Sequence, residues 1–192
     1  MSHIADRFVV VLDANVLFPF RKKDILLSFY EAGLFRGRWT MRILDEWQRS
    51  LTKRKPHLEQ SVVSQIAQMG KTFPEALVVD YEGLIDTVSL PDPDDRHVLA
   101  AAIRCGAQLI VTDNLKDFPD ALLAPFDLKA ISADGFLSQT FELYPYHALP
   151  IIREIRARYE MPAYTPAEFL MDLAAKGLPL LAAQLRSKLD LI

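Results

Sequence analysis

The sequence predicts an α/β fold, with helices on both faces of a central parallel sheet and a small all-helical C-terminal appendage. Two observations support this prediction. Continuous apolar runs that are too short for helices alternate with helical patterns in the first part of the chain, which is typical of a parallel sheet buried on both faces. From Tyr144 onward only helical patterns remain. We therefore expect two domains, residues 1–143 and residues 144–192.

The composition limits the class of protein and its partners. The chain has 192 residues, 51% of them hydrophobic, which suits one compact domain with a small addition. Lys and Arg total 22 against 25 Asp and Glu, so the formal net charge is -3 and any nucleic-acid surface must be local. A single cysteine, Cys105, excludes an internal disulfide and a cysteine-built metal site, and it fits a reducing compartment.

The amino terminus does not have the pattern of a secretory signal. Residues 1–7 place Asp6 just before the apolar run Phe8–Leu12, and no later segment approaches the roughly 20 apolar residues needed to span a membrane. We therefore expect a soluble, cytoplasmic protein with no membrane partner.

The first elements follow from apolar spacing. Phe8–Leu12 is a β-branched and aromatic run that predicts a buried strand ending at Asp13. Apolar residues at helical spacing predict a helix over Lys23–Ala32, which the following glycine stops. Thr40 is placed to cap a second helix, whose inward stripe includes Trp47.

The middle of the chain is predicted to contain two more helices. One is expected over Glu59–Met69, and residues 77–80 and 88–90 are expected to be short extended pieces. Asp94 stands where a helix N-cap belongs, and the apolar spacing after it predicts a buried helix ending at Cys105.

Two further apolar runs, Gln108–Thr112 and Leu128–Ile131, predict the remaining strands. Ser132 is placed to cap the helix that follows. In the C-terminal region, Thr165–Glu168 combines a capping box with proline at the first helical position, and Pro179 separates the last two helical segments.

Acidic residues follow the expected strands. Asp13 ends the first strand, and Asp113 and Asn114 end the strand Gln108–Thr112. In an open parallel sheet the ligand crevice lies outside the carboxyl ends of the strands. Asp94 and Asp95 begin the helix that leads to the second of these strands, and Glu46 on a polar helix face could complete the cluster. Each acid alone has an ordinary explanation as a turn, a cap or a solvated side chain, but the combination favours a shared site.

Converging carboxylates predict a particular chemistry. They repel each other and are costly unless a cation neutralises them. Oxygen-only ligands favour Mg²⁺ or Mn²⁺ over zinc. Such a site can acidify a water molecule and orient a phosphodiester for hydrolysis. No Ser/His/Asp or Cys/His arrangement and no glycine-rich phosphate loop competes with it, and His97 is interpreted as structural.

Three segments resemble the motifs of PIN domains, which are metal-dependent nucleases. Val11–Leu17 resembles the opening of the family, in which the strand-end acid, here Asp13, binds metal. Asp92–Ala102 resembles the helix of the third acid, for which Asp95 is the best match and Asp94 the alternative. Val111–Phe118 resembles the fourth segment, whose acid maps onto Asn114, with Asp113 beside it.

The resemblance extends over about residues 8 to 135 and implies a PIN-like three-layer fold. Glu46 falls where the second acid of the family is expected. The implied metal ligands are Asp13, Asp95 and Asp113; Glu46 and Asn114 complete the catalytic set, and Asn15, Asp94 and Thr112 are possible additions.

Many members of this family are toxins of the VapC type, which cut RNA and are silenced by an antitoxin. The resemblance therefore implies a Mg²⁺- or Mn²⁺-dependent endoribonuclease, with one or two ions, an RNA substrate, a cognate antitoxin and a possible homodimer. The C-terminal helices lie outside the resemblance. We expect them to dock on the domain, on a second subunit or on an antitoxin.

Basic residues concentrate around the first two expected helices. Arg21, Lys22 and Lys23 follow the loop of the first acid, and Arg42 and Arg49 lie on the second helix. Beside a metal crevice they could hold an RNA backbone without reading its sequence; a solvated helix face is the alternative. Trp39 and Phe35 are candidates for stacking on bases, with core packing as the alternative.

Two other functions remain open from the sequence. One is a catalytically silent module that keeps the fold and binds RNA or protein. The other is a phospho-acceptor domain in which Asp13 itself is phosphorylated, which would require a lysine near the acids.

Overall fold

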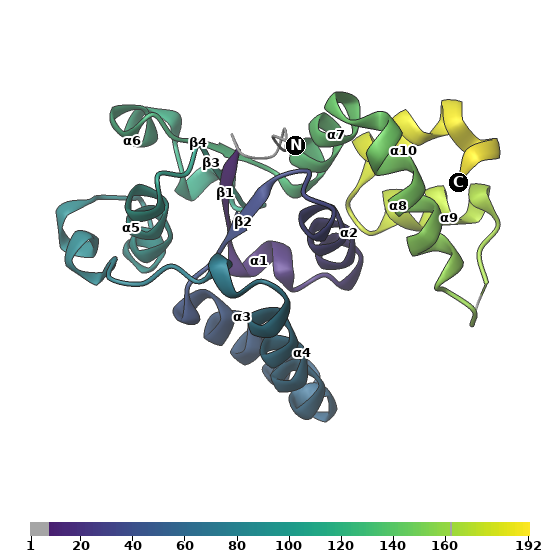
Figure 1. The fold of residues 1–192 in the computed structure, drawn as a ribbon. Coiled ribbons are helices and arrows are strands. Elements are labelled where there is room, and N and C mark those ends of the chain that lie inside the picture. The colour runs from purple at the N-terminus through teal and green to yellow at the C-terminus, as the bar shows by residue number, and fades with distance from the viewer. Residues whose placement is uncertain (1–7, 162) are drawn as a thin grey trace. The chain divides into compact units, whose positions relative to one another are not determined.

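The computed structural model describes residues 8–161 and 163–192 and contains a four-stranded, fully parallel sheet flanked by helices (Figure 1). The predicted α/β class with a parallel sheet is confirmed. The strand order is β2-β1-β3-β4. The strands are β1 (Val9–Leu12), β2 (Arg36–Arg38), β3 (Leu109–Val111) and β4 (Lys129–Ile131).

The strand order places a topological switch between β1 and β3. The chain leaves β1 for β2 on one side and later returns to β3 on the other. Leu12 of β1 is in register with Val111 of β3, so the residues that follow these two strands lie next to each other. A crevice at the carboxyl ends of the strands is expected at such a point.

By its internal contacts the chain divides into two compact units. The first unit comprises the chain up to Phe18 together with Phe35–Ile131, and the second comprises Pro19–Leu34 together with Ser132–Ile192. The expected domain boundary at residues 143 and 144 stays a prediction, since compact units need not coincide with domains along the sequence.

The first unit contains the sheet and the helices that hold the acids. Helix α5 packs against β1 and β3, and α3 packs against α1 and α4. The strands are buried because Val10, Val11 and Leu12 are fully inaccessible. The α-helices of this unit are α1 (Ala14–Leu17), α3 (Met41–Arg54), α4 (Glu59–Thr72), α5 (Arg96–Cys105) and α6 (Asp120–Leu123).

Several local signals in this unit were predicted correctly. The hydroxyl of Thr40 accepts a hydrogen bond from the Ile43 amide at 3.1 Å and caps α3. Gly106 has a φ of 63° and ends α5 in the left-handed conformation, which suits glycine. The expected cap at Asp94 was wrong, because Asp92 accepts a hydrogen bond from the Asp94 amide at 2.9 Å and caps a short 3-10 turn, η5 (Pro93–Asp95).

The second unit consists of helices. They are α2 (Phe20–Glu31), α7 (Ala133–Leu143), α8 (Pro145–Ala157), α9 (Pro166–Ala175) and α10 (Pro179–Leu185), followed by the 3-10 segment η8 (Arg186–Leu191). The expected capping box forms, since Thr165 caps α9 and Glu168 bonds back to it. Among the described residues, no helix is long and apolar enough to cross a membrane. The amino-terminal residues 1–7, on which the expectation about a signal rests, lie outside the described part.

Two predictions about strands were incomplete. Strand β2 was missed because Arg36-Gly37-Arg38 is a short, charged edge strand without an apolar run. Of the extended pieces expected at 77–80 and 88–90, only Leu77 pairs, in an isolated bridge with Trp39. The rest of both pieces is irregular backbone.

Candidate active site

Asp13 sits at the carboxyl end of β1 and is held in one orientation. Its carboxylate accepts hydrogen bonds from the Ala14 amide at 2.6 Å and from the Thr112 hydroxyl at 2.8 Å. The side-chain amide of Asn15 donates to it at 2.5 Å. Only 4% of Asp13 is exposed. The carboxylate of Asp13 is therefore held in a fixed position at the buried side of the site at this edge of the sheet.

The loop after β3 is fastened to the loop after β1. The Asn15 side chain donates to the Thr112 hydroxyl at 2.8 Å and accepts from the Asp113 amide at 3.0 Å. The Thr112 hydroxyl also accepts from the Asn114 amide at 3.1 Å. The two predicted additions, Asn15 and Thr112, thus lie beside Asp13 and join the two strand ends.

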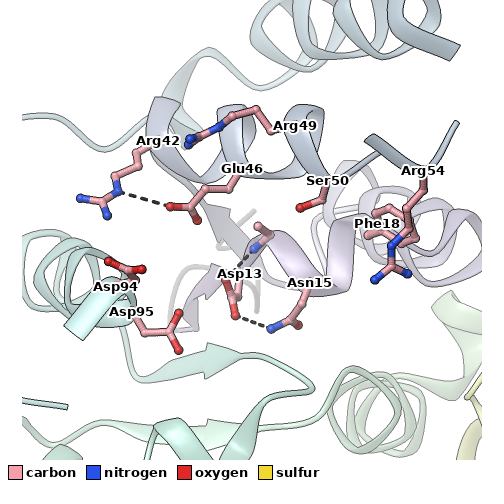
Figure 2. A pocket seen from close by; sticks show the side chains of 11 residues that line it. Asp13, Asn15, Phe18, Arg42, Glu46, Arg49, Ser50, Arg54, Asp94 and Asp95 are labelled. Atoms are coloured by element: carbon pink, nitrogen blue, oxygen red, sulfur yellow. Dashed lines mark hydrogen bonds and ion pairs between the residues drawn. The ribbon is translucent and has the colours of Figure 1, made fainter. Parts of the chain in front are cut away.

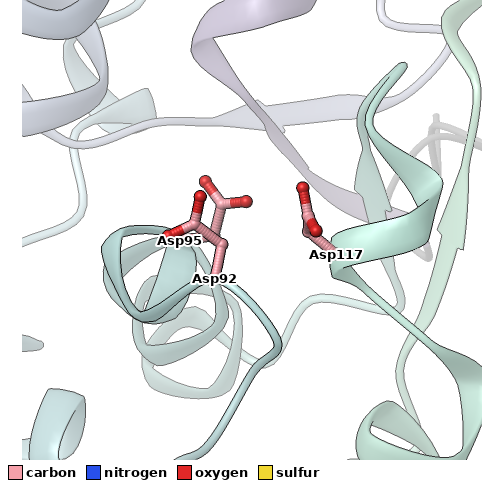
Figure 3. Close-up of side chains that lie close together, drawn as sticks. All are labelled: Asp92, Asp95 and Asp117. Carbon is pink, nitrogen blue, oxygen red and sulfur yellow. The ribbon is translucent and has the colours of Figure 1, made fainter.

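A second group of carboxylates lies at the start of α5. One carboxylate oxygen each from Asp92, Asp95 and Asp117 lies within 4.8 Å of the others, and Figure 3 shows Asp117 facing the other two. Asp117 comes from η6 (Leu115–Asp117), the turn after β3. Asp95 occupies the N-cap position of α5 but makes no side-chain cap, and its Oδ2 is buried without a hydrogen-bond partner among the described residues.

Glu46 projects from α3 and is contacted by two basic side chains. Arg42 Nε lies 3.3 Å from its Oε1, one helical turn away. His97 Nε2 lies 3.1 Å from the same oxygen, although the contact is not aligned as a hydrogen bond. His97 is 1% exposed, so the histidine interpreted as structural also connects α5 to the predicted second acid.

The electrostatic environment resists the negative charge of two of these acids. Burial raises the pKa of Asp13, and nearby Glu46 adds to the rise. Burial raises the pKa of Asp95 to about 6, and the neighbouring aspartates, first of all Asp13, add to it. Glu46 differs: burial raises its pKa, but His97 and Arg42 together outweigh burial and leave it below its usual value.

These acids open into a cavity of about 760 Å³. Figure 2 shows Asp94 and Asp95 on one side, Asp13 and Asn15 in the middle, and Phe18 and Arg54 on the far side. Arginines from α3 line the cavity together with the acids. The lining residues are Asp13, Ala14, Asn15, Phe18, Arg42, Glu46, Arg49, Ser50, Arg54, Asp94 and Asp95.

The donor set fits a hard divalent cation. All the converging side chains offer oxygen, which favours Mg²⁺ or Mn²⁺. The buried, unpartnered Oδ2 of Asp95 lacks the compensation that buried polar atoms normally have. A bound cation would supply it and would also offset the burial and the repulsion between neighbouring aspartates that raise the pKa of Asp95.

The structure separates the residues that were expected to fill the fourth position. The Asn114 side chain donates to the Asp117 carboxylate. Asp113 is exposed and is not one of the three clustered aspartates, and its backbone amide bonds to Asn15. Sequence reasoning missed Asp92 and Asp117 as members of the cluster. The Asp-Phe pair at Asp117-Phe118 was the available signal, because the buried Phe118 fixes the turn.

The expected basic surface is only partly present. Arg42 and Arg49 line the cavity. Arg21, Lys22 and Lys23 instead belong to the second unit and are buried, and Arg21 is paired with Asp172. The expectation of an exposed basic run there was wrong, because α2 turns this side toward neighbouring helices of its unit.

The aromatic candidates also differ from the expectation. Trp39 and Phe35 are each 1% exposed and pack in the core, which was the stated alternative to stacking on bases. The aromatic residue in the cavity is Phe18.

The sheet order and the acids at its switch point define an α/β protein with a carboxylate site suited to a divalent cation. Residues 9–116 match the family model described as PIN domain, and residues 133–187 match the model described as VapC50 C-terminal domain. The first match covers more than half of the chain, which belongs to the PIN-domain family. The C-terminal helices thus also have a family relationship that sequence reasoning did not assign.

A curated relative is similar over part of the chain. It is named "Putative ribonuclease VapC50", from Mycobacterium tuberculosis (strain ATCC 25618 / H37Rv), and is 42% identical over 92 residues, which are 48% of this chain and 54% of that protein. The chain thus spans about half the length of the curated relative it matches. No solved structure matches the chain.

Proposed function

We propose that this protein is a Mg²⁺- or Mn²⁺-dependent endoribonuclease. The proposal rests on one cavity that is lined by both acidic and basic side chains. Asp13, Glu46 and Asp95 line it together with Arg49 and Arg54, neither of which has an acidic partner among the described residues. Carboxylates suit the cation, and arginines without a carboxylate partner suit the phosphates of a nucleic acid. The name of the mycobacterial relative favours RNA as that nucleic acid.

We assign each residue a role from its position in the site. We propose that Asp13, Asp95 and Asp117 hold the cation. Glu46 and Asp92 lie near these ligands, and Asp113 stays a candidate metal ligand. When bound, the cation would supply acidification of water and neutralisation of charge on the phosphodiester. Asn15 and Thr112 orient Asp13 through their hydrogen bonds. Arg49 and Arg54 would hold the RNA backbone, and no side-chain nucleophile is needed.

The test is metal-dependent cleavage of RNA by the purified full chain. We expect cleavage of a single-stranded RNA in Mg²⁺ or Mn²⁺ and none in EDTA. Asp13→Asn should lower the rate at least about 100-fold, because a fixed ligand loses its charge while Asn15 and Thr112 still hold the side chain. Glu160→Gln, an acid of the second unit, is the control and should cleave like the wild type.

The outcome also separates the rival functions. A wild-type protein that binds RNA, cleaves none and gains no thermal stability from divalent ions would be a silent binding module. The phospho-acceptor function is disfavoured because no lysine is among the residues that line the cavity. Detection of an acid-labile phosphoryl group on Asp13 would revive it.

We further propose that the chain is the toxin of a type II toxin-antitoxin pair and works in the cytoplasm. The match of residues 133–187 to the VapC50 C-terminal domain and the name of the relative support this. A neighbouring reading frame for a small DNA-binding protein, whose co-expression relieves growth arrest, is the expected observation. Size-exclusion chromatography would then show whether the chain forms a homodimer, alone or with this antitoxin. Growth unaffected by expression of the chain alone would count against the toxin role.

A further inference from the structure

The cavity is not lined by the carboxylates alone and continues past Asp13 to residues that are not acidic. At the side away from Asp95 its lining changes from acids to Ser50, Arg54 and Phe18 (Figure 2). Phe18 follows α1 directly, so it lies about one helical turn from Asp13. The same short helix therefore positions a proposed metal ligand and an aromatic ring in one cavity.

Phe18 and Arg54 are in cation–π contact. The guanidinium carbon of Arg54 lies over the Phe18 ring, 5.0 Å from its centroid, a cation–π arrangement. Arg54 is exposed and Phe18 is half-buried. Arg54 has no carboxylate partner among the described residues, and its guanidinium contacts the Phe18 ring.

A flat apolar ring with a flat cation over it is a surface that nucleobases recognise. Unpaired bases in protein–RNA complexes stack on aromatic rings and on guanidinium planes, and every base offers a π-face. A structural role in which Arg54 merely shields Phe18 from water would leave the pair indifferent to bases. The location of the pair in the cavity that Asp13 and Asp95 also line favours the binding role.

We propose that Phe18 and Arg54 form a stacking subsite for one unpaired base of the RNA, next to the phosphodiester that is cut. The inference rests on the proposed ribonuclease function and adds to it the position in the cavity where a base would bind. A base in a duplex is stacked between its neighbours and cannot enter such a subsite.

The experiment measures RNA binding by the full chain in Ca²⁺, with strand integrity checked on a gel. The ligands are a labelled single-stranded RNA of mixed sequence, the same strand made abasic, and an RNA duplex. Phe18→Ala should weaken binding of the base-bearing strand about 10-fold, a loss in the range of one base–aromatic stack. It should leave binding of the abasic strand and of the duplex unchanged.

Two further variants keep the result independent of any loss of packing at Phe18. Phe18→Trp retains a ring and should bind like the wild type or more tightly. Arg54→Lys retains the charge but not the plane, so it should weaken binding of the base-bearing strand while the salt dependence of binding stays the same. Thermal melting of each variant verifies that it is folded.

Matched controls lie nearby. Phe20 is 58% exposed and has Lys23 Nζ 5.6 Å from its ring centroid, but it does not line the cavity. Phe20→Ala should therefore bind the base-bearing strand like the wild type. Lys53→Gln, one residue before Arg54 and also outside the lining, should have at most a small effect that is equal for all three ligands.

The outcomes distinguish the subsite from the ribonuclease function. If the wild type cleaves RNA but Phe18→Ala and Arg54→Lys bind the base-bearing strand as tightly as it does, the subsite is wrong and the function stands. An equal loss for base-bearing and abasic strands would also overturn the subsite. A wild type that neither binds nor cleaves RNA would overturn both.

Discussion

The two units of this protein both bury charged side chains, but they treat them in opposite ways. In the second unit, the buried Arg21 and the buried Asp134 each have partners of complementary charge or polarity, although Arg21 Nη1 has no hydrogen-bond partner among the described residues. Arg21 Nε lies 2.5 Å from Asp172 Oδ2, and its guanidinium carbon lies 3.6 Å from the centroid of the Tyr159 ring. Asp134 accepts hydrogen bonds from the amides of Leu180 and Leu181 at the start of α10.

In the first unit, charges of the same sign are brought together. Asp92, Asp95 and Asp117 converge, Asp13 lies close enough to raise the pKa of Asp95, and one oxygen of Asp95 has no partner among the described residues. A buried charge with a partner costs much less than one without, and like charges brought together destabilise a fold. The difference indicates that the second unit is arranged for stability and that the cluster of the first is arranged for a ligand.

The largest expected effect on stability lies in the second unit. Asp172→Ala would leave the Arg21 guanidinium buried without its carboxylate, and we expect a loss of about 2–3 kcal/mol in the free energy of unfolding. Urea denaturation measures it. RNA cleavage at a temperature where the variant is folded should be nearly normal. A loss of activity without a loss of stability would break the contrast between the units.

In the first unit, removal of a charge is expected to raise the free energy of unfolding. Asp95→Asn removes a repelled charge, so in EDTA at pH 7.5 it should raise the free energy of unfolding by about 1 kcal/mol, discounted for partial exposure. Metal-dependent activity should be lost. Adding Mn²⁺ should stabilise the wild type and not the variant. A variant that is less stable than the wild type in EDTA would contradict the account of the cluster.

The same carboxylate gives a pH dependence with a defined sign. The pKa of Asp95 is raised to about 6 in the folded protein, so the folded state binds more protons than the unfolded state between about pH 4 and 6. Its contribution therefore lowers stability as the pH rises through this range and is constant above it. The difference in unfolding free energy between the wild type and Asp95→Asn, measured in EDTA from pH 4 to 8, should follow this course. A difference that is flat across the range would contradict it.

A smaller effect is expected at the contact between α5 and α3. His97→Leu removes the nitrogen that lies 3.1 Å from Glu46, so Glu46 loses a neighbour that lowers its pKa. We expect cleavage to fall about 10-fold or less, mainly in kcat, with RNA binding unchanged. His97→Gln, which keeps a donor of similar reach, should recover part of the rate. Equal rates for the two variants would show that the contact only fills space.

Much of the fold follows from local sequence signals. Strands β1 and β3 were predicted because each is a continuous apolar run, and β4 was predicted from apolar residues that Lys129 interrupts. The caps at Thr40, Ser132 and Thr165 were predicted because capping depends on neighbours in the sequence. Strand β2 was missed because its pairing with β1 is through backbone, at register positions such as Gly37 opposite Val10. The amino acids of an edge strand need not reveal it.

The site was predictable as a set of strand-end acids but not in its details. The position of Asp13 follows from the parallel sheet and a buried strand. The grouping of Asp117 with Asp92 depends on the path of a turn, and a shift of a few residues there decides which carboxylate points inward. The burial of Arg21 depends on Asp172, which is distant in the sequence, and no local sequence pattern predicts such a partner.

The central claim is that the carboxylates at the switch point hold a divalent cation. The most direct measurement is a titration of the metal-free protein with Mn²⁺, in which electron paramagnetic resonance counts the free ion. We predict saturable binding of one or two ions to the wild type at pH 7.5 and the loss of at least one of them in both Asp13→Asn and Asp95→Asn. Binding of the same number of ions, with the same affinity, by the wild type and both variants would contradict it.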